Sequence, residues 1–432
     1  MKYYSLHHKA PIVSFREAVI QGIAPDRGLY FPKEIPSLSN EFFQQLPTLQ
    51  RNEIAFEVIQ NFVGDTIPKD QLQQIIAETL VFDFPLVEVE NNIMALELYH
   101  GPTLAFKDVG ARFMARCLGY FNKESGNEKV TVLVATSGDT GGAVADGFYE
   151  VPGVEVVILY PSGKVSDIQE KQLTTLGKNI QALEVSGSFD DCQAMVKQAF
   201  LDATITSKRN LTSANSINVA RWLPQMFYYF FAFQQLEAHA SEVVFSVPSG
   251  NYGNICAGMM AKRLGLPISH FVAATNVNDV VPQYLVSGTY QPQPTKPTIA
   301  NAMDVGDPSN FIRIQTLYGN NLHRLREDLS GFSFTDEQTR NALVSLYREH
   351  QYQADPHGAI GYLALQKYLQ DKEGVGVFLE TAHPVKFLDV LPESLSEAIA
   401  IPENIQQIMP KKKKAEKIST YSQLKDYLVT NA

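Results

Sequence analysis

A repeated alternation of short apolar runs and helix-like stretches most constrains the fold of this chain. Val130–Ala135 is apolar almost throughout, a glycine-rich turn follows it, and a helical pattern comes next. The same order returns after residues 243–247. Strands that alternate with helices form parallel sheets through right-handed crossovers, and ligands bind at the carboxyl ends of such strands. The sequence therefore predicts an α/β protein whose functional residues lie in the turns after its strands.

The same patterns predict further elements along the chain. Expected strands cover residues 154–160, 180–185, 270–275 and 375–380, and expected helices cover 52–63, 69–80, 166–177, 222–236 and 255–264. Ser188 and Thr335 are placed to cap the starts of two more helices, the second of which runs to His350. We divide the chain into an N-terminal domain (1–95), an α/β domain (96–235) and a second α/β domain (236–432).

Composition matters here for the partners that it excludes. The longest apolar runs, 227–233 and 130–135, fall far short of the roughly 18 residues that a membrane span needs. The 36 Lys and Arg against 46 Asp and Glu give a net charge of −10. An acidic surface argues against general nucleic-acid binding, which depends on neutralising phosphates. We therefore expect a small-molecule partner, and neither a membrane nor a nucleic acid.

The cysteines and the terminal segments show no pattern typical of a disulfide framework, a metal site, a signal peptide or a polyanion-binding patch. Cys117, Cys192 and Cys256 are odd in number and form no C-x-x-C pair, so neither a disulfide framework, a zinc ribbon nor any other metal site is expected. Residues 1–5 lack the apolar block of a signal peptide, and we expect a reducing, cytoplasmic setting. The lysine run 411–414 is interpreted as a solvated tail segment rather than a polyanion-binding patch.

Three turns are candidates for ligand binding: 100–108, 136–142 and 248–254. None contains the GxGxxG or GxxxxGK[ST] pattern of nucleotide-binding proteins. A strand followed by a glycine-rich turn and a helix start still forms an anion site, because unpaired amides converge there and the helix dipole favours negative charge. Residues 249–254 have this character and, lacking a lysine, suit a monophosphate. The alternative is a tight turn without a ligand.

Lys107 is the most informative single residue. It lies between Phe106 and Asp108, at the start of a helical pattern. Apolar neighbours disfavour the ammonium form, and a neutral amine is what a Schiff base with an aldehyde requires. A solvent-facing lysine at a helix start is the alternative. The phosphate-type turn elsewhere in the same chain favours the functional interpretation.

A third constellation lies at residues 215–221. Asn215, Ser216 and Asn218 supply neutral donors, and Arg221 supplies a planar charged group suited to phosphate or carboxylate. Capping of the aromatic helix that follows is the alternative, and both roles are compatible. Thr381 follows an expected strand, where its hydroxyl could reach a cofactor.

These motifs together resemble the threonine synthase family, which consists of pyridoxal-phosphate enzymes of fold type II. The resemblance runs from near residue 4 to about residue 392 and is carried in order by 22–32, the Lys107 segment, 136–142, 249–254, 355–358 and 380–384. Two positions depart from the usual pattern. Arg27 stands where glycine is frequent, and Asp139 stands where other fold-type-II families carry asparagine. The second departure leaves the partner of the cofactor's ring hydroxyl unassigned.

The resemblance implies two α/β domains with mainly parallel sheets around a cofactor cleft, a small N-terminal domain, and pyridoxal 5'-phosphate as cofactor. It implies conversion of O-phospho-L-homoserine and water to L-threonine and phosphate. Lys107 would form the Schiff base and move protons, and Thr381 would hydrogen-bond the pyridine nitrogen. The remaining implied contacts are Gly250, Asn251, Tyr252 and Asn254 with the cofactor phosphate, Asn215, Ser216, Asn218 and Arg221 with the substrate phosphate, and Ser137, Asp139 and Thr140 with the substrate carboxylate and nearby polar groups.

Two other functions stay open at this point. A related pyridoxal-phosphate dehydratase or phospholyase would share Lys107 and the cofactor loop without needing residues 215–221 in this form. A non-catalytic binding or scaffold protein would have lost the site, but Lys107, Gly250 and Arg221 are all present. The sequence leaves a monomer and a homodimer equally open.

Overall fold

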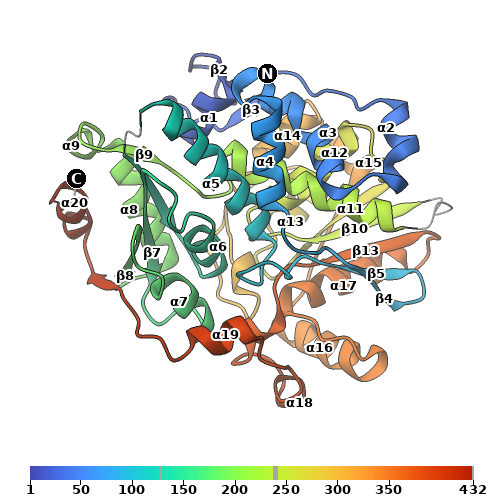
Figure 1. Ribbon diagram of the computed structural model, residues 1–432. Coiled ribbons are helices and arrows are strands. Elements are labelled where there is room, and N and C mark those ends of the chain that lie inside the picture. The colour runs from blue at the N-terminus through green and yellow to red at the C-terminus, as the bar shows by residue number, and fades with distance from the viewer. Residues whose placement is uncertain (127–128, 237–241, 431–432) are drawn as a thin grey trace.

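The computed structural model of the protein describes residues 1–126, 129–236 and 242–430, which form three sheets with helices packed around them (Figure 1). The six-stranded sheet has the order β12-β11-β10-β13-β5-β4. Its strands are β4 (Leu86–Glu90), β5 (Ile93–Glu97), β10 (Val243–Pro248), β11 (His270–Thr275), β12 (Leu329–Ser333) and β13 (Val375–Glu380). All neighbours are parallel except β4, which runs antiparallel to β5.

The five-stranded sheet has the order β14-β8-β7-β6-β9 and is parallel throughout. Its strands are β6 (Val130–Ala135), β7 (Val154–Pro161), β8 (Ile180–Val185), β9 (Asn210–Thr212) and β14 (Glu416–Ile418). The associated helices include α5 (Lys107–Glu124), α6 (Asp139–Gly147), α7 (Asp167–Thr174), α8 (Phe189–Leu201) and α20 (Tyr421–Thr430). The edge strand β14 thus returns from the far C-terminal part of the chain to a sheet built by residues 130–212.

The N-terminal part forms a small antiparallel sheet of order β2-β1-β3, flanked by helices. Its elements are β1 (Lys2–Ser5), β2 (Val13–Ser14), β3 (Tyr30–Pro32), α1 (Phe15–Gln21), α2 (Asn40–Gln45), α3 (Arg51–Val63) and α4 (Lys69–Thr79). Phe31 stacks on the buried Trp222, and their ring centroids lie 6.1 Å apart. Contacts of this kind join the N-terminal part to the larger units.

The expected fold class, two mainly parallel α/β units with a small N-terminal domain, is confirmed. Four strands have the expected bounds: 130–135, 180–185, 270–275 and 375–380. Ser166, Ser188 and Thr335 each cap a helix and complete a capping box, because the third helical residue bonds back to the cap.

The expected helix over 222–236 is wrong in its first part. The chain forms α10 (Val219–Trp222), a 3-10 turn (Leu223–Gln225) and α11 (Met226–Gln235). Pro224 lacks an N–H and is tolerated only in a first helical turn, so a new helical segment begins around it. The helix expected over 166–177 ends earlier, at Thr174.

The domain limits at residues 95 and 235 stay a prediction, but the sheets group the strands differently. Residue 95 lies inside β5, and both β4 and β5 pair within the six-stranded sheet. β14 belongs to the five-stranded sheet although it lies beyond residue 236. None of the helices within the described ranges is both long and apolar enough to cross a membrane.

Candidate active site

Lys107 lies beside Thr381 because the segment before it pairs with the end of β13. The backbone N–H of Phe106 donates to the carbonyl of Thr381 over 2.9 Å, and Ala105 forms an antiparallel bridge with Ala382. Lys107 is the first residue of α5, and Thr381 directly follows the last residue of β13. The structure therefore places both at the carboxyl end of a central strand, where parallel sheets bind ligands.

The Lys107 ammonium is largely shielded from water. Its side chain is 17% exposed, and Nζ lies 4.7 Å from the centroid of the Phe106 ring and 3.5 Å from Oδ2 of Asp139. Burial lowers the pKa of Lys107 below its usual value, and the Asp139 carboxylate only partly opposes this. The shift has the direction that a lysine acting as a neutral amine needs.

The first glycine-rich turn, 136–142, presents Asp139 to Lys107. The Thr136 hydroxyl accepts the backbone N–H groups of Gly138 and Gly141 over 2.9 and 2.8 Å, which fixes the turn. Asp139 Oδ1 accepts from Gln169 Nε2 over 3.0 Å. Ser137 and Thr140 are half-buried, and their hydroxyls form no hydrogen bond within the described part of the chain.

Asp139 also pairs with a residue that the sequence analysis did not single out. Lys386 Nζ lies 2.8 Å from Asp139 Oδ1, and both side chains are buried. Burial alone would raise the pKa of Asp139, but Lys386 and Lys107 hold it well below the usual range. The carboxylate is therefore ionised. Lys386 follows the quoted motif 380–384 within an apolar stretch, and that position is the signal that could have identified it.

The second glycine-rich turn leads into α12 (Gly253–Arg263), whose N-cap Tyr252 has a left-handed φ of 61°. Among the described residues, the backbone N–H groups of Gly250, Asn251 and Tyr252 donate to no protein acceptor. Unpaired amides at the start of a helix of this length form an anion site. A Cβ at Gly250 would lie 2.6 Å from the carbonyl oxygen of Ala302, so only glycine fits. Asn254 Nδ2 donates to the Pro248 carbonyl over 2.8 Å and closes the turn.

The segment 215–221 lies between the two turns. Asn215 Nδ2 donates to the carbonyl of Ala135, at the end of β6, over 3.1 Å. The Ser216 hydroxyl accepts from Asn251 Nδ2 over 2.8 Å. One short segment therefore contacts both the strand before the first turn and the second turn itself.

Asn218 takes the capping role that the sequence left open. It is the N-cap of α10, and its Oδ1 accepts the backbone N–H of Ala220 over 3.0 Å. Its Nδ2 donates to the carbonyls of Val19 and Ser213 over 2.9 and 3.1 Å. All of its polar atoms are thus used within the protein, which makes Asn218 a residue that positions its neighbours.

Arg221 places a buried guanidinium group near Asp108, in the first turn of α5. Its side chain is 2% exposed and donates to the Ala214 carbonyl, while its Nε finds no partner among the described residues. Burial lowers the pKa of Arg221 to about 10, and the nearby Asp108 opposes this. A buried guanidinium with a free N–H suits an anion that enters the site.

A hydrogen-bonded network links Ala382, the residue after Thr381, to Ala302, which packs against the second turn. Asp355, the N-cap of α17 (Pro356–Leu369), accepts the backbone N–H of Ala382 over 3.0 Å and also accepts from the ring of His357. His357 Nε2 accepts the backbone N–H of Ala302 over 3.2 Å, and the carbonyl of Ala302 faces Gly250. Residues 355–358 carry part of the family resemblance, but no role was predicted for them individually.

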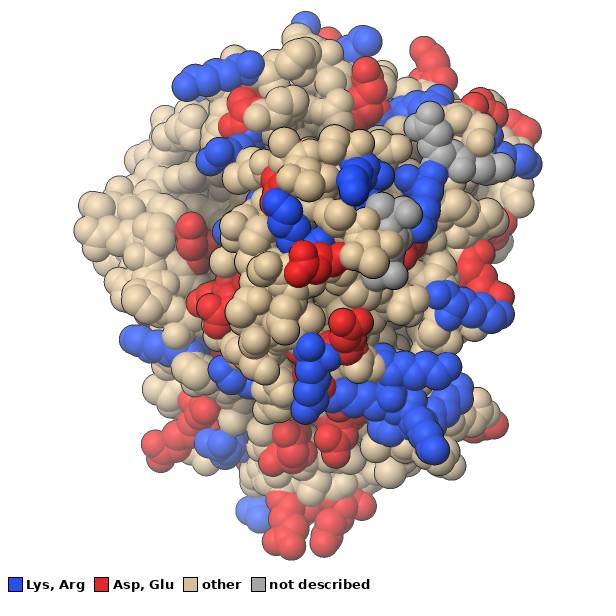
Figure 2. Space-filling view, turned by 90° about the vertical axis from the view of Figure 1, so that its left-hand side faces the viewer, with Lys and Arg blue, Asp and Glu red and all other residues tan. Residues whose placement is uncertain are grey.

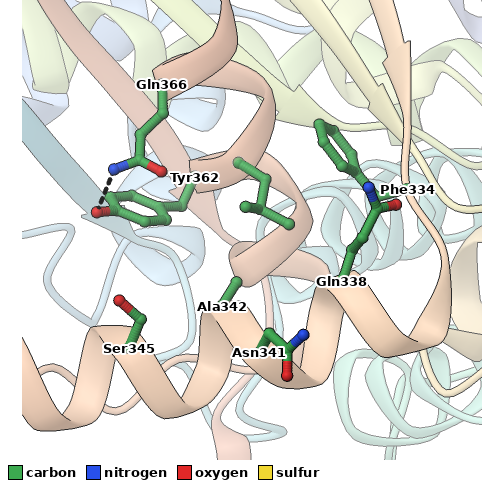
Figure 3. Close-up of a pocket in the computed structure, with 8 residues that line it drawn as sticks. Phe334, Gln338, Asn341, Ala342, Ser345, Tyr362 and Gln366 are labelled. Carbon is green, nitrogen blue, oxygen red and sulfur yellow. Dashed lines mark hydrogen bonds between the residues drawn. The ribbon is translucent and has the colours of Figure 1, made fainter.

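A separate groove between α16 (Asp336–His350) and α17 contains none of these residues (Figure 3). Its volume is about 320 Å³, and Tyr362 and Gln366 on one wall bond to each other over 2.6 Å. Within the described residues, no group of three His, Cys, Asp or Glu side chains is placed to hold a metal ion.

These residues fit a phosphorylated aldehyde: a lysine with a depressed pKa, free amides at a helix start, and the nearly buried hydroxyl-bearing residue Thr381. The family model described as "Pyridoxal-phosphate dependent enzyme" matches residues 73–379. Fold and site thus define an enzyme of the pyridoxal-phosphate class, and the expected cofactor is confirmed.

More specific matches identify the family. The models "Threonine synthase N terminus" and "Threonine synthase, C-terminal" match residues 2–80 and 358–428. The threonine synthase of Escherichia coli is 43% identical over 408 residues, covering 94% of each chain. Its crystal structure aligns with a TM-score of 0.94 at 41% identity, covering 100% of both chains. A structure titled as a PLP-bound threonine synthase from Brucella melitensis aligns with a TM-score of 0.91 at 34% identity, covering 100% of this chain and 99% of the other.

The chain belongs to the threonine synthase family. The expected family and enzyme class are thereby confirmed. The roles of individual site residues stay predictions.

Proposed function

We propose that this enzyme converts O-phospho-L-homoserine and water to L-threonine and phosphate, with Lys107 as the lysine that binds the cofactor covalently. The observation that carries the proposal is a pair of distinct anion-binding groups near Lys107. One is the set of free amides at Gly250–Tyr252, which suits the cofactor phosphate. The other is the buried Arg221, which suits a second phosphate on the substrate. A substrate without a phosphate would leave the second group unused.

The residues then have separate tasks. When bound, the cofactor withdraws electrons from the substrate carbons and so acidifies the protons on them. Lys107, as a neutral amine, accepts and returns those protons. Ser137 and Thr140 carry half-buried hydroxyls that suit the substrate carboxylate, whereas the ionised Asp139 suits cationic groups. Arg221 holds the departing phosphate, with Asn215 and Ser216 as neutral donors beside it.

The proposal also covers the cofactor contacts and the setting of the enzyme. Asn251, Tyr252 and Asn254 shape the phosphate turn around Gly250, and the Thr381 hydroxyl would meet the pyridine nitrogen. A hydroxyl at that place, unlike a carboxylate, leaves the nitrogen unprotonated. We further propose a cytoplasmic setting, which is supported by three buried cysteines that are all free. The enzyme would be a monomer or a homodimer.

Reduction of the cofactor-loaded enzyme with borohydride, followed by peptide mass analysis, tests the assignment of Lys107. The cofactor adduct is expected on Lys107, and an adduct on another lysine would overturn the assignment. Lys107→Ala should abolish turnover while the far-ultraviolet circular dichroism stays unchanged.

The substrate is tested by assaying O-phospho-L-homoserine beside L-serine and L-threonine. Threonine and phosphate are expected from the first compound. Ammonia and an oxo acid from serine or threonine, without turnover of the phosphorylated substrate, would favour the dehydratase alternative. Arg221→Lys and Arg221→Ala should raise the KM for the phosphorylated substrate more than the Kd for the cofactor.

A further inference from the structure

Lys386 is a fully buried lysine that forms one ion pair within the described part of the chain. It lies in the 3-10 turn Pro384–Phe387, directly after the motif that contains Thr381. Its side chain is 0% exposed, and its Nζ lies 2.8 Å from Asp139 Oδ1. No other hydrogen-bond acceptor among the described residues engages this ammonium group. Burying an ammonium ion is costly, so its position beside the reactive lysine calls for a physical reason.

One carboxylate serves two lysines. Asp139 Oδ1 faces Lys386 over 2.8 Å, and Asp139 Oδ2 faces Lys107 over 3.5 Å. The lysines come from different parts of the chain, since Lys107 begins α5 and Lys386 follows β13. The shorter distance belongs to Lys386, which therefore takes the larger share of the carboxylate's charge.

This sharing bears on the protonation of Lys107. The charged groups that face Lys107 are Asp139 from α6, Lys386 from the turn after β13 and Arg221 from α10. Asp139 alone favours the ammonium form of Lys107, whereas the two cations disfavour it. A site with Asp139 but without Lys386 would hold Lys107 as an ion pair, which is the unreactive form of the amine.

We propose that Lys386 is a positioning residue that neutralises Asp139 and thereby lets Lys107 act as a neutral amine. The inference rests on the proposed role of Lys107. A purely structural role explains the pair poorly, because the desolvation of two buried charges largely offsets their attraction. Asp139 and Lys386 together thus tune the amine that binds the cofactor.

The test measures covalent capture of pyridoxal phosphate by the full-length chain freed of cofactor. The neutral amine of Lys107 adds to the aldehyde carbon, and water leaves as the carbon–nitrogen double bond forms. Borohydride reduction at a series of pH values fixes the product, and peptide mass analysis quantifies the adduct on residue 107. The initial rate of capture against pH then gives the midpoint at which Lys107 becomes neutral.

Four variants separate the charges: Lys386→Met, Lys386→Arg, Asp139→Asn and the double variant Lys386→Met with Asp139→Asn. Lys386→Met should raise the midpoint by about one pH unit, which slows capture about tenfold at lower pH. Asp139→Asn should lower the midpoint. The double variant should return it to within about half a unit of the native value, and Lys386→Arg should keep it there. Lys412→Met, at an exposed position, is the control for loss of a lysine elsewhere.

Each outcome decides the matter. A folded Lys386→Met protein with an unchanged midpoint overturns the inference, even if its melting temperature falls. If Lys386→Met does not fold, the midpoints of the double variant and of Lys386→Arg still test the inference. A midpoint in the double variant equal to that of Asp139→Asn alone overturns it. An adduct on a residue other than 107 overturns the assignment of Lys107, which is a separate failure.

Discussion

Gly250 shows how a missing side chain shapes the site at the scale of one residue. A Cβ there would lie 2.6 Å from the Ala302 carbonyl oxygen and 2.9 Å from Cα of Met303. Both are backbone atoms, which cannot turn aside as a flexible side chain can. The turn that presents the free amides therefore packs directly against the 3-10 turn Asn301–Met303.

Gly250→Ala should weaken cofactor binding at least about tenfold, because the turn must move away from Ala302 and its amides lose their convergence. Equilibrium titration with pyridoxal phosphate measures the effect. Gly119→Ala is the matched control, since a Cβ at Gly119 in α5 would meet only one methyl group of Val151, at 3.1 Å. Equal affinity of both variants would contradict the role of Gly250.

His270 gives the stability of the fold a dependence on pH. Its ring is buried against Tyr368, and Nδ1 donates to the carbonyl of Glu327 over 3.1 Å. Burial lowers the pKa of His270 to about 4. The folded protein therefore binds fewer protons than the unfolded chain between pH 4 and 6.5. The stabilising contribution is present above about pH 6.5 and is lost as the pH falls towards 4.

His270→Gln should remove this dependence. When the pH is lowered from 6.5 to 4, the free energy of unfolding of the native protein should decrease by up to about 3 kcal/mol more than that of the variant. Urea unfolding across that pH range measures the difference. His323→Gln, at an exposed position in α15 (Leu322–Asp328), should keep the native slope. The same slope in native protein and His270→Gln would refute the prediction.

Residues that stand at motif positions could be predicted from the sequence, and residues that act across the fold could not. Lys107 and Thr381 were predicted because Lys107 stands at the start of a helical pattern and Thr381 follows an expected strand. Arg313 gave no such signal, yet its buried guanidinium donates to carbonyls of Tyr30 and Ser216 and so joins β3 to the segment beside the second glycine-rich turn. Lys386 was missed for a related reason: its partner Asp139 is 247 positions away.

At the scale of elements, local chemistry determined what could be predicted. Ser166, Ser188 and Thr335 were expected helix starts, and each begins a helix, because a cap is decided by neighbours within four residues. The break at Pro224 was missed, because apolar residues continue on both sides of it. Which strand pairs with which, as for β5 with β13, depends on contacts that no local pattern contains.

Thr335→Ala should destabilise the protein by about 1 kcal/mol, because the first turn of α16 loses the hydroxyl that accepts the backbone N–H of Gln338. The position is exposed, so little packing is lost with the hydroxyl. Chemical denaturation measures the effect. Thr335→Ser keeps the acceptor and should stay near the native stability, and a Ser variant as unstable as the Ala variant would contradict the capping role.

At the scale of the whole molecule, the C-terminal strap (residues 403–418) ties the two α/β units together. It begins with α19 (Glu403–Ile408), passes α7 and ends as β14 at the edge of the five-stranded sheet (Figure 1). The Lys414 backbone N–H donates to the Thr174 carbonyl over 3.0 Å. On the face that carries the strap, Lys and Arg side chains gather in a dense group next to acidic ones (Figure 2).

The lysine run 411–414 was expected to be a solvated tail, and its four residues are exposed, but Lys413 also forms ion pairs that were not expected. Its Nζ lies 2.6 Å from Glu170 and 2.7 Å from Glu184, the second of which is 6% exposed. Lys413→Ala should therefore cost about 1–2 kcal/mol, since Glu184 loses its nearest cation while remaining buried. Lys412→Ala, at an exposed neighbour in the same run, should change the melting temperature little. Equal melting temperatures for the two variants would show that Lys413 is not an anchor.

The position of β14 also has a consequence for synthesis on the ribosome. β8 ends at Val185, but β14, the strand that covers its free edge, begins only at Glu416. While residues 186–415 are synthesised, the peptide groups along the outer edge of β8 therefore have no strand to pair with. Such an edge can recruit a strand from another molecule. Slow emergence of the last segment would thus favour aggregation, and chaperones that shield β8 would favour correct maturation.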